Sequence, residues 1–138
     1  MEKVENMQHI KSNTIQVKAS SSQIFDFISD FNNLEKLMPE KVIDWSSTMT
    51  TCTFTIQGMA TLNMKQGQHK TNEKVQMVSY GKNPFPFDLN THIAENSEKE
   101  SEVFIQLNAE MNPMLAMMAK KPLQNFVNIL AKELAGQF

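Results

Sequence analysis

The C-terminal segment constrains the fold of this chain more than any other feature. Apolar side chains recur there at the spacing of one helical face, at positions Leu123, Phe126, Val127, Leu130 and Leu134. Asn112 is a good helix N-cap and Pro113 suits the first helical position, so we predict a long helix that begins there. A long amphipathic helix must bury its apolar face against another element. The rest of the chain must therefore supply that surface.

A proline lies inside this predicted helix. Pro122 lacks an amide proton and crowds the carbonyl of residue 118, which costs about 3 kcal/mol or more in a helix interior. We therefore predict a kink or a break near residues 118–121. The turn before it is rich in methionine, with Met111, Met114, Met117 and Met118. Methionine adapts to varied apolar neighbours, so we interpret this turn as core or cavity wall, with a partner surface or a thioether copper site as alternatives.

The segment from residue 41 to residue 110 has a different period. Apolar and polar side chains alternate over six runs, 42–46, 52–56, 60–64, 73–80, 85–93 and 102–110. Polar or glycine-containing breaks separate the runs, which is typical of consecutive strands. Strict alternation predicts an antiparallel sheet with one face in solvent. Pro86, inside the fifth run, predicts an edge or a bulge at that point.

The first forty residues are predicted to form one strand and two short helices. The strand covers residues 7–18. Ser20 and Gln23 have the spacing of a capping box, which predicts a helix start before the apolar positions of 24–31. A second short helix is predicted over Leu34–Met38, capped by Asn32 or Asn33 and stopped by Pro39.

This order of elements, together with the first helix, carries a resemblance to a known superfamily. The segment 19–31, ASSSQIFDFISDF, resembles the first helix of the START-like (SRPBCC) superfamily, and the closing helix that starts at Asn112-Pro113 matches as well. That superfamily includes the lipid-transfer START domains, the birch-pollen-allergen proteins and the polyketide cyclase/dehydrase and lipid-transport family. The resemblance covers nearly the whole chain and implies one domain, residues 1–138. The implied fold is α+β helix-grip: a curved antiparallel sheet of about seven strands, two short helices after strand 1, and a long C-terminal helix packed on the sheet.

The charges and the rare residue types exclude several functions. All 13 basic residues are lysines and the net charge is −2. Because arginine is the usual residue for bidentate contacts with phosphates and guanine, we expect no nucleic-acid partner. Cys52 is the only cysteine and the three histidines have no ligand spacing, so we expect no metal and no cofactor. The chain contains no run of 18 apolar residues and no signal-like start, so we expect a cytoplasmic protein without integral membrane association. The oligomeric state stays open.

The first functional hypothesis is a binding module. The curved sheet and the helix would enclose a cavity for a small hydrophobic molecule, lipid- or polyketide-like, which the protein would hold or carry. Trp45, Tyr80, Asp44 and Glu110 are the candidate polar anchors for such a ligand. The positions predicted to line the cavity are Phe54, Ile56, Leu62, Met64, Phe85, Phe87, Leu89, Ile105, Leu107, Leu115, Met118, Phe126 and Leu130.

Two other functional classes compete with this hypothesis. A cyclase, dehydratase or hydrolase could use the same cavity and would need a buried ionisable group, for which Asp44 and Glu110 are the candidates. Asp88 is interpreted as a residue on the wet face of its strand, and no catalytic residue is assigned. A protein-interaction or co-chaperone-like role would use an exposed strand edge or the Met-rich turn, and predicts an exposed apolar patch.

Overall fold

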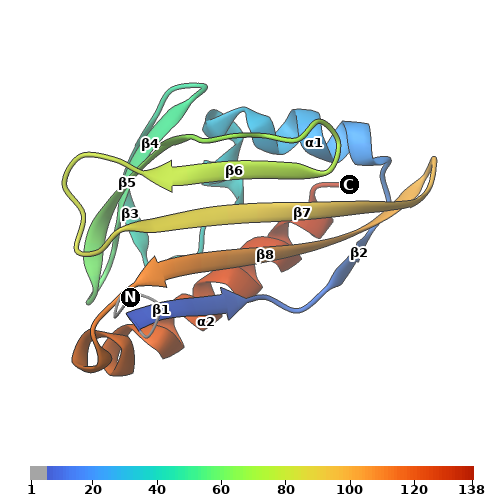
Figure 1. The fold of residues 1–138 in the computed structure, drawn as a ribbon. Coiled ribbons are helices and arrows are strands. Elements are labelled where there is room, and N and C mark those ends of the chain that lie inside the picture. Colours follow the sequence, from blue (N-terminus) through green and yellow to red (C-terminus); the bar gives the residue numbers. More distant parts are fainter. Residues whose placement is uncertain (1–5) are drawn as a thin grey trace.

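The sheet and the long C-terminal helix together form the α+β helix-grip fold that the sequence predicts (Figure 1). The computed structural model of the protein describes residues 6–138. In chain order, the sheet strands are β1 (Met7–Lys11), β2 (Ile15–Val17), β3 (Val42–Ser47), β4 (Thr51–Ile56), β5 (Ala60–Gln66), β6 (Lys74–Ser79), β7 (Phe87–Ser97) and β8 (Glu100–Glu110). They form one antiparallel sheet in the order β1-β8-β7-β6-β5-β4-β3, and β2 also pairs with β8. The helices are α1 (Ser21–Ser29), the 3₁₀ helix η2 (Phe31–Leu37) and α2 (Pro113–Gly136).

The first predicted strand is divided into two, which makes eight strands where about seven were expected. β1 and β2 pair with successive parts of β8, and a bulge lies between them. Ser12 fills this bulge. Its amide donates to the carbonyl of Ile105 at 2.8 Å, and the amide of Ile105 donates to the Ser12 hydroxyl at 2.8 Å. Because the serine replaces the lost ladder contacts, the strand can bend and remain on β8.

The capping box that begins α1 is confirmed. The Ser20 hydroxyl accepts from the Gln23 amide and the Gln23 side chain accepts from the Ser20 amide. The next residue ties the helix to the sheet, because the amide and the hydroxyl of Ser21 donate to Glu95 of β7 at 2.9 Å and 2.8 Å. These two hydrogen bonds hold the pKa of Glu95 below its usual value.

The second short helix begins earlier than predicted. It starts at Phe31, and its N-cap is Asp30, whose carboxylate accepts from the Asn32 amide at 3.0 Å. The predicted asparagine cap is therefore wrong. Asp30 ends α1 and also caps η2, and it is the single residue between the two helices. Pro39 follows the end of η2, as predicted.

Two predictions on the last strands are wrong. Residues 94–101 were expected to form a break, but β7 runs to Ser97 and β8 begins at Glu100, so a tight turn joins two long strands. Pro86 was expected on an edge or a bulge within a strand. It lies just before β7, which pairs on both sides, with β6 and β8. A proline at that position removes no hydrogen bond from the ladder.

The helix α2 is continuous through Pro122, so it is not broken there, and the alternative of a kink stays a prediction. Its start is as predicted, with the Asn112 side chain accepting from the Leu115 amide at 2.8 Å. The helix packs on β1, β2 and β8 and on η2. Continuity follows from burial on both sides of the proline, where Ala119 and Leu123 are both at most 1% exposed. The apolar contacts oppose the cost of the missing hydrogen bond.

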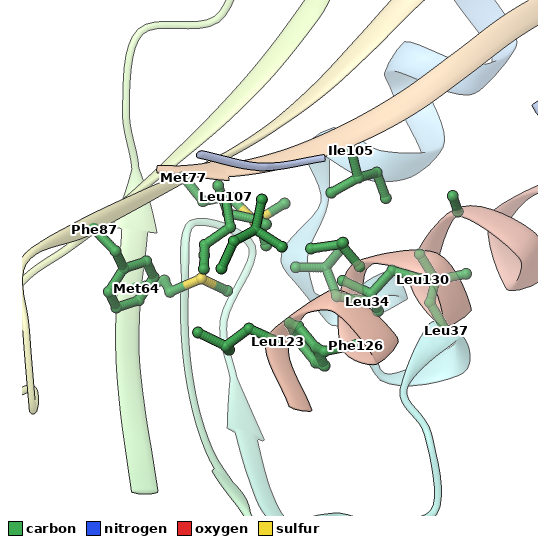
Figure 2. Close-up of a cluster of buried hydrophobic side chains, with 14 of the residues drawn as sticks. Leu34, Leu37, Met64, Met77, Phe87, Ile105, Leu107, Leu123, Phe126 and Leu130 are labelled. Atoms are coloured by element: carbon green, nitrogen blue, oxygen red, sulfur yellow. The ribbon is translucent and has the colours of Figure 1, made fainter. Parts of the chain in front are cut away.

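The core fills the space between the inner face of the sheet and α2 (Figure 2). Met64, Met77 and Leu107 point from the sheet towards Leu123 of the helix, and Leu34 of η2 closes one side. All five side chains are at most 3% exposed. The alternation read from the sequence therefore places the correct face of these strands inward.

A substitution at Leu123 measures how much the contact between α2 and the sheet contributes to the stability of the fold. Leu123→Ala should lower the free energy of unfolding by about 2–5 kcal/mol, because it leaves a cavity at the centre of the core. Urea denaturation followed by circular dichroism measures the change. Met117→Ala is the matched control, since it shortens a large apolar side chain on the exposed face of the same helix. Equal losses in the two variants would contradict the assignment of Leu123 to the core.

Candidate functional site

A cleft of about 620 Å³ opens where three segments meet. They are the loop after η2, the turn between β4 and β5, and the middle of α2 around Pro122 (Figure 1). The residues that line it are Pro39, Glu40, Lys41, Ile56, Gln57, Gly58, Met59, Lys121, Pro122, Asn125, Phe126 and Ile129. Its walls thus come from parts of the chain that are far apart in sequence.

Backbone hydrogen bonds hold two of these walls together. The amide of Gln57 donates to the carbonyl of Lys41 at 2.8 Å, which fixes the β4–β5 turn against the loop after η2. Within the turn, the amide of Met59 donates to the carbonyl of Ile56 at 3.0 Å. Gly58 has a φ of 80°, a left-handed conformation that side chains with a Cβ rarely adopt. The turn therefore needs glycine to keep its shape.

The floor of the cleft is aromatic and aliphatic. Phe126 is 3% exposed and stacks on Phe54 with ring centroids 5.9 Å apart. Phe54 in turn stacks on Trp45 at 5.4 Å. This row of three rings links α2, β4 and β3. Ile56, also buried, completes the floor beside Phe126.

The rim of the cleft is polar. Glu40 and Lys41 lie on one side, and Lys121 and Asn125 lie on the helix opposite them. All four side chains are exposed. Pro122 stands between the helical pair, and because it has no amide proton the carbonyl of residue 118 lacks its usual helical partner. The arrangement combines an apolar floor with charged groups at the mouth, which suits a ligand that has an apolar body and a polar end.

The structure brings only part of the predicted cavity set to this cleft. Ile56 and Phe126 line it. Leu115 is half-buried, and Met118 is 73% exposed and does not line the cleft. The other members are buried and pack in the core, namely Phe54, Leu62, Met64, Phe85, Phe87, Leu89, Ile105, Leu107 and Leu130. That a ligand binds among these core side chains stays a prediction.

Most side chains of the Met-rich turn lie in solvent, whereas we expected them in the core or in a cavity wall. Met111 is buried, in agreement with the prediction. Met114, Met117 and Met118 are exposed, so the interpretation as core is wrong for these three. The physical reason is the position of the helix: the face that carries them turns away from the sheet, and Ala116 and Ala119 take the buried face instead.

The predicted polar anchors lie outside the cleft. The indole of Trp45 donates to the Ser47 hydroxyl at 3.0 Å, and Tyr80 is 40% exposed at the end of β6. Asp44 is exposed, with a φ of 55°, where the pairing of β3 with β4 shifts register. Glu110 is half-buried at the end of β8.

Asp88 lies on the face of β7 opposite to the core, as interpreted from its phase. Its carboxylate accepts hydrogen bonds from the side chains of Asn90 and Asn108. His92 lies on the same outer face, where its ring stacks on Phe104 at 4.6 Å. Burial, with smaller contributions from Lys74 and Lys11, lowers the pKa of His92. These groups form a polar outer surface of the sheet and are separate from the cleft.

Of the residues that line the cleft, only Ile56 and Phe126 were predicted, and the charged residues Glu40 and Lys41 are among those that sequence reasoning missed. Both belong to a loop without periodicity, so no hydrophobic pattern marked them. The available signal was Pro39, which ends η2 and turns the chain towards β3.

Cys52 packs in the core as a small buried side chain. It is 2% exposed, and burial raises the pKa of its thiol to about 12. A thiol with such a pKa is almost entirely protonated at neutral pH and is a poor nucleophile.

No protein-family model matches the sequence, and no curated protein matches it. Solved structures do match. The protein XoxI from Bacillus cereus has a TM-score of 0.72 at 14% identity, and the match covers 94% of each chain. A START superfamily protein from Mycobacterium smegmatis has a TM-score of 0.67 at 18% identity, over 95% of each chain. Norcoclaurine synthase from Thalictrum flavum, solved with dopamine and hydroxybenzaldehyde, has a TM-score of 0.70 at 12% identity, over 95% of this chain and 86% of that one.

These matches and the order of elements identify the fold as that of the START-like proteins, among which norcoclaurine synthase is a structural neighbour. At such identities the likeness concerns the fold. Among the helices of residues 6–138, none is long and apolar enough to cross a membrane.

The protection of Cys52 can be tested in solution. The native protein should react with a thiol reagent such as dithionitrobenzoate far more slowly than the urea-unfolded protein, because the reagent needs an accessible thiolate. Absorbance of the released thiolate measures both rates. Rapid, complete labelling of the native chain at neutral pH would contradict the buried position of this residue.

Proposed function

We propose that the protein binds a small hydrophobic molecule, lipid- or polyketide-like, in the cleft beside Pro122. The observation that carries this proposal is the apolar floor of a cleft of about 620 Å³. Sites for small molecules commonly have volumes of roughly 300–1,000 Å³, mostly apolar walls and a few polar groups. A carrier is the simplest function for such a site.

The rim favours a ligand with a polar or acidic end. Lys41 and Lys121 face the mouth from opposite walls, and their ammonium groups can donate to a carboxylate or a phenolate. Glu40 lies beside them, so the rim is mixed in charge and also accepts a hydroxyl donor. The apolar part of the ligand would rest on Phe126 and Ile56.

The packed core limits how deep the ligand can lie. Met64 and Leu107 are each 1% exposed and occupy the space behind the floor (Figure 2). Leu62 is equally buried and belongs to the same core. Because protein interiors are close-packed, a long chain could enter only by displacing these side chains. We therefore expect a compact ligand, or one whose longer part stays at the mouth.

A structural neighbour supports a binding role for this fold. The norcoclaurine synthase from Thalictrum flavum was solved in complex with dopamine and hydroxybenzaldehyde, which are small aromatic molecules. The two sequences are 12% identical, so the comparison supports a cavity-based function and does not transfer the ligand.

Binding is favoured over catalysis by the position of the acidic groups. Asp44 and Glu110, the candidates for acid–base chemistry, lie away from the cleft. Glu40 lines the cleft but is exposed to solvent. A general acid or base is usually tuned by enclosure in an apolar site, which this carboxylate lacks.

A fluorescent apolar probe tests the proposal. The naphthalene dye 1-anilinonaphthalene-8-sulfonate has an apolar body and an anionic end, so it should bind in the cleft and gain fluorescence. Asn125→Trp should fill the mouth and weaken binding by at least about tenfold, the equivalent of 1.4 kcal/mol. Fluorescence titration measures the dissociation constant.

Lys132→Trp is the matched control, because it adds the same side chain to an exposed position of α2 outside the cleft. It should bind the dye as the wild-type chain does. Equal affinity in all three proteins would contradict the proposed site. Independently of the dye, native mass spectrometry of the protein purified from its own host should identify a retained hydrophobic ligand.

A further inference from the structure

Three methionines on α2 are exposed to an unusual degree. Met114, Met117 and Met118 are 75%, 85% and 73% exposed. Their spacing of i, i+3 and i+4 puts them together on one face of the helix. We refer to these three residues as the methionine face. Large apolar side chains that cluster on the surface of a protein commonly mark a contact with another apolar body.

The charged side chains that α2 itself carries near the methionine face are cationic. Between residues 111 and 132 the chain has three lysines, Lys120, Lys121 and Lys132, and no acidic residue. Lys121 lies one turn beyond Met117 and Met118 on the same side of the helix. Apolar side chains next to lysines are the combination found on helices that lie at the surface of anionic membranes.

The position of this part of α2 leaves it accessible. Figure 1 shows the first turns of the helix, in orange, at one end of the molecule beyond the ends of β1 and β8. Asn112 caps the helix there, and its side chain accepts from the backbone amide of Leu115. The methionine face can therefore contact a flat surface without unfolding any element.

We propose that the methionine face and its neighbouring lysines dock the protein on the surface of a membrane that contains anionic lipids. The methionine side chains enter the boundary between headgroups and acyl chains, and Lys120 and Lys121 contact lipid phosphates. Methionine suits this role because its flexible thioether side chain adapts to a disordered apolar partner.

Charge distinguishes a membrane from a second copy of this chain. In a two-fold dimer built on this face, the same patch would meet itself, so both copies would bring Lys120 and Lys121 into one interface. Like charges at close range oppose such a contact. An anionic lipid surface instead attracts these lysines, with roughly a fivefold gain in affinity for each lysine near the surface.

Docking in this way would bring the cleft to the lipid. Lys121 and Pro122 line the cleft, and the methionine face lies on the preceding turn of the same helix. The docking itself does not rest on the proposed ligand, because it uses side chains outside the cleft floor. A variant with a filled cleft distinguishes membrane docking from ligand binding. Asn125→Trp should still bind membranes although its affinity for the dye is reduced.

Co-sedimentation with vesicles tests the docking. The full chain should sediment with vesicles of equal parts phosphatidylglycerol and phosphatidylcholine, and much less with phosphatidylcholine alone. Replacing all three residues of the methionine face by glutamine should lower binding at least about tenfold, because it removes most of the apolar contact. The variant should fold, since the three side chains are exposed and glutamine is a good helix former.

Two controls match these changes. Met49→Gln alters a methionine that is 63% exposed in the turn between β3 and β4, and should bind vesicles as the wild-type chain does. Lys120→Gln should weaken binding to the anionic vesicles by roughly fivefold. Lys99→Gln, in the turn between β7 and β8 at the other end of the sheet (Figure 1), should not.

A polarity-sensitive dye on the methionine face provides a second measurement. In a Cys52→Ala background, Met117→Cys labelled with such a dye should shift its emission to the blue when anionic vesicles are added. A wild-type chain that stays in the supernatant with both vesicle types would overturn the proposal. So would a lipid-free dimer that the triple glutamine variant converts to a monomer, since the face would then be an interface between copies of this chain.

Discussion

The apolar contact between α2 and the inner face of the sheet is the interaction on which the rest of the structure depends. Leu123, Val127 and Leu134 of the helix have no exposed surface, and they belong to one buried cluster with side chains from the strands and η2. Burial of this extent stabilises the helix strongly enough to carry Pro122 in its middle. It also fixes the rotation of α2, and with it the side chains that face the core, the cleft and the solvent.

The cleft follows from that rotation. With Leu123 and Leu130 turned towards the sheet, Pro122, Asn125 and Ile129 come to the side that faces the β4–β5 turn, and Phe126 lies between the two sides. The turn is held by Gly58 and by the hydrogen bond from Gln57 to Lys41. The site is thus a consequence of packing, and its polar residues come from loops that the core does not need. The same rotation exposes the methionine face next to the cleft mouth.

Patterns of short range could be read correctly from the sequence. The capping box at Ser20, the cap at Asn112 and the alternation of the strands depend on neighbours within a few residues, and each is present in the structure. The errors occurred where tertiary contacts override local preference. Ser12 allows a bulge because β8 offers Ile105 as its partner. The helix continues through Pro122 because the core holds residues on both sides of it.

The sequence by itself determined the order of the elements, the inward face of the strands and the helix-grip class, because periodicity and caps are local properties of a chain. Only the tertiary structure decided which apolar residues fill the core and which line a cleft. Met64 and Ile56 have the same strand phase, yet Met64 packs in the interior and Ile56 borders the cleft. The difference depends on which segment, distant in sequence, lies against each residue. A hydrophobic pattern contains no information on which segments come together. The exposure of Met114, Met117 and Met118 has the same origin, since the angle at which a helix settles on a sheet is set by packing.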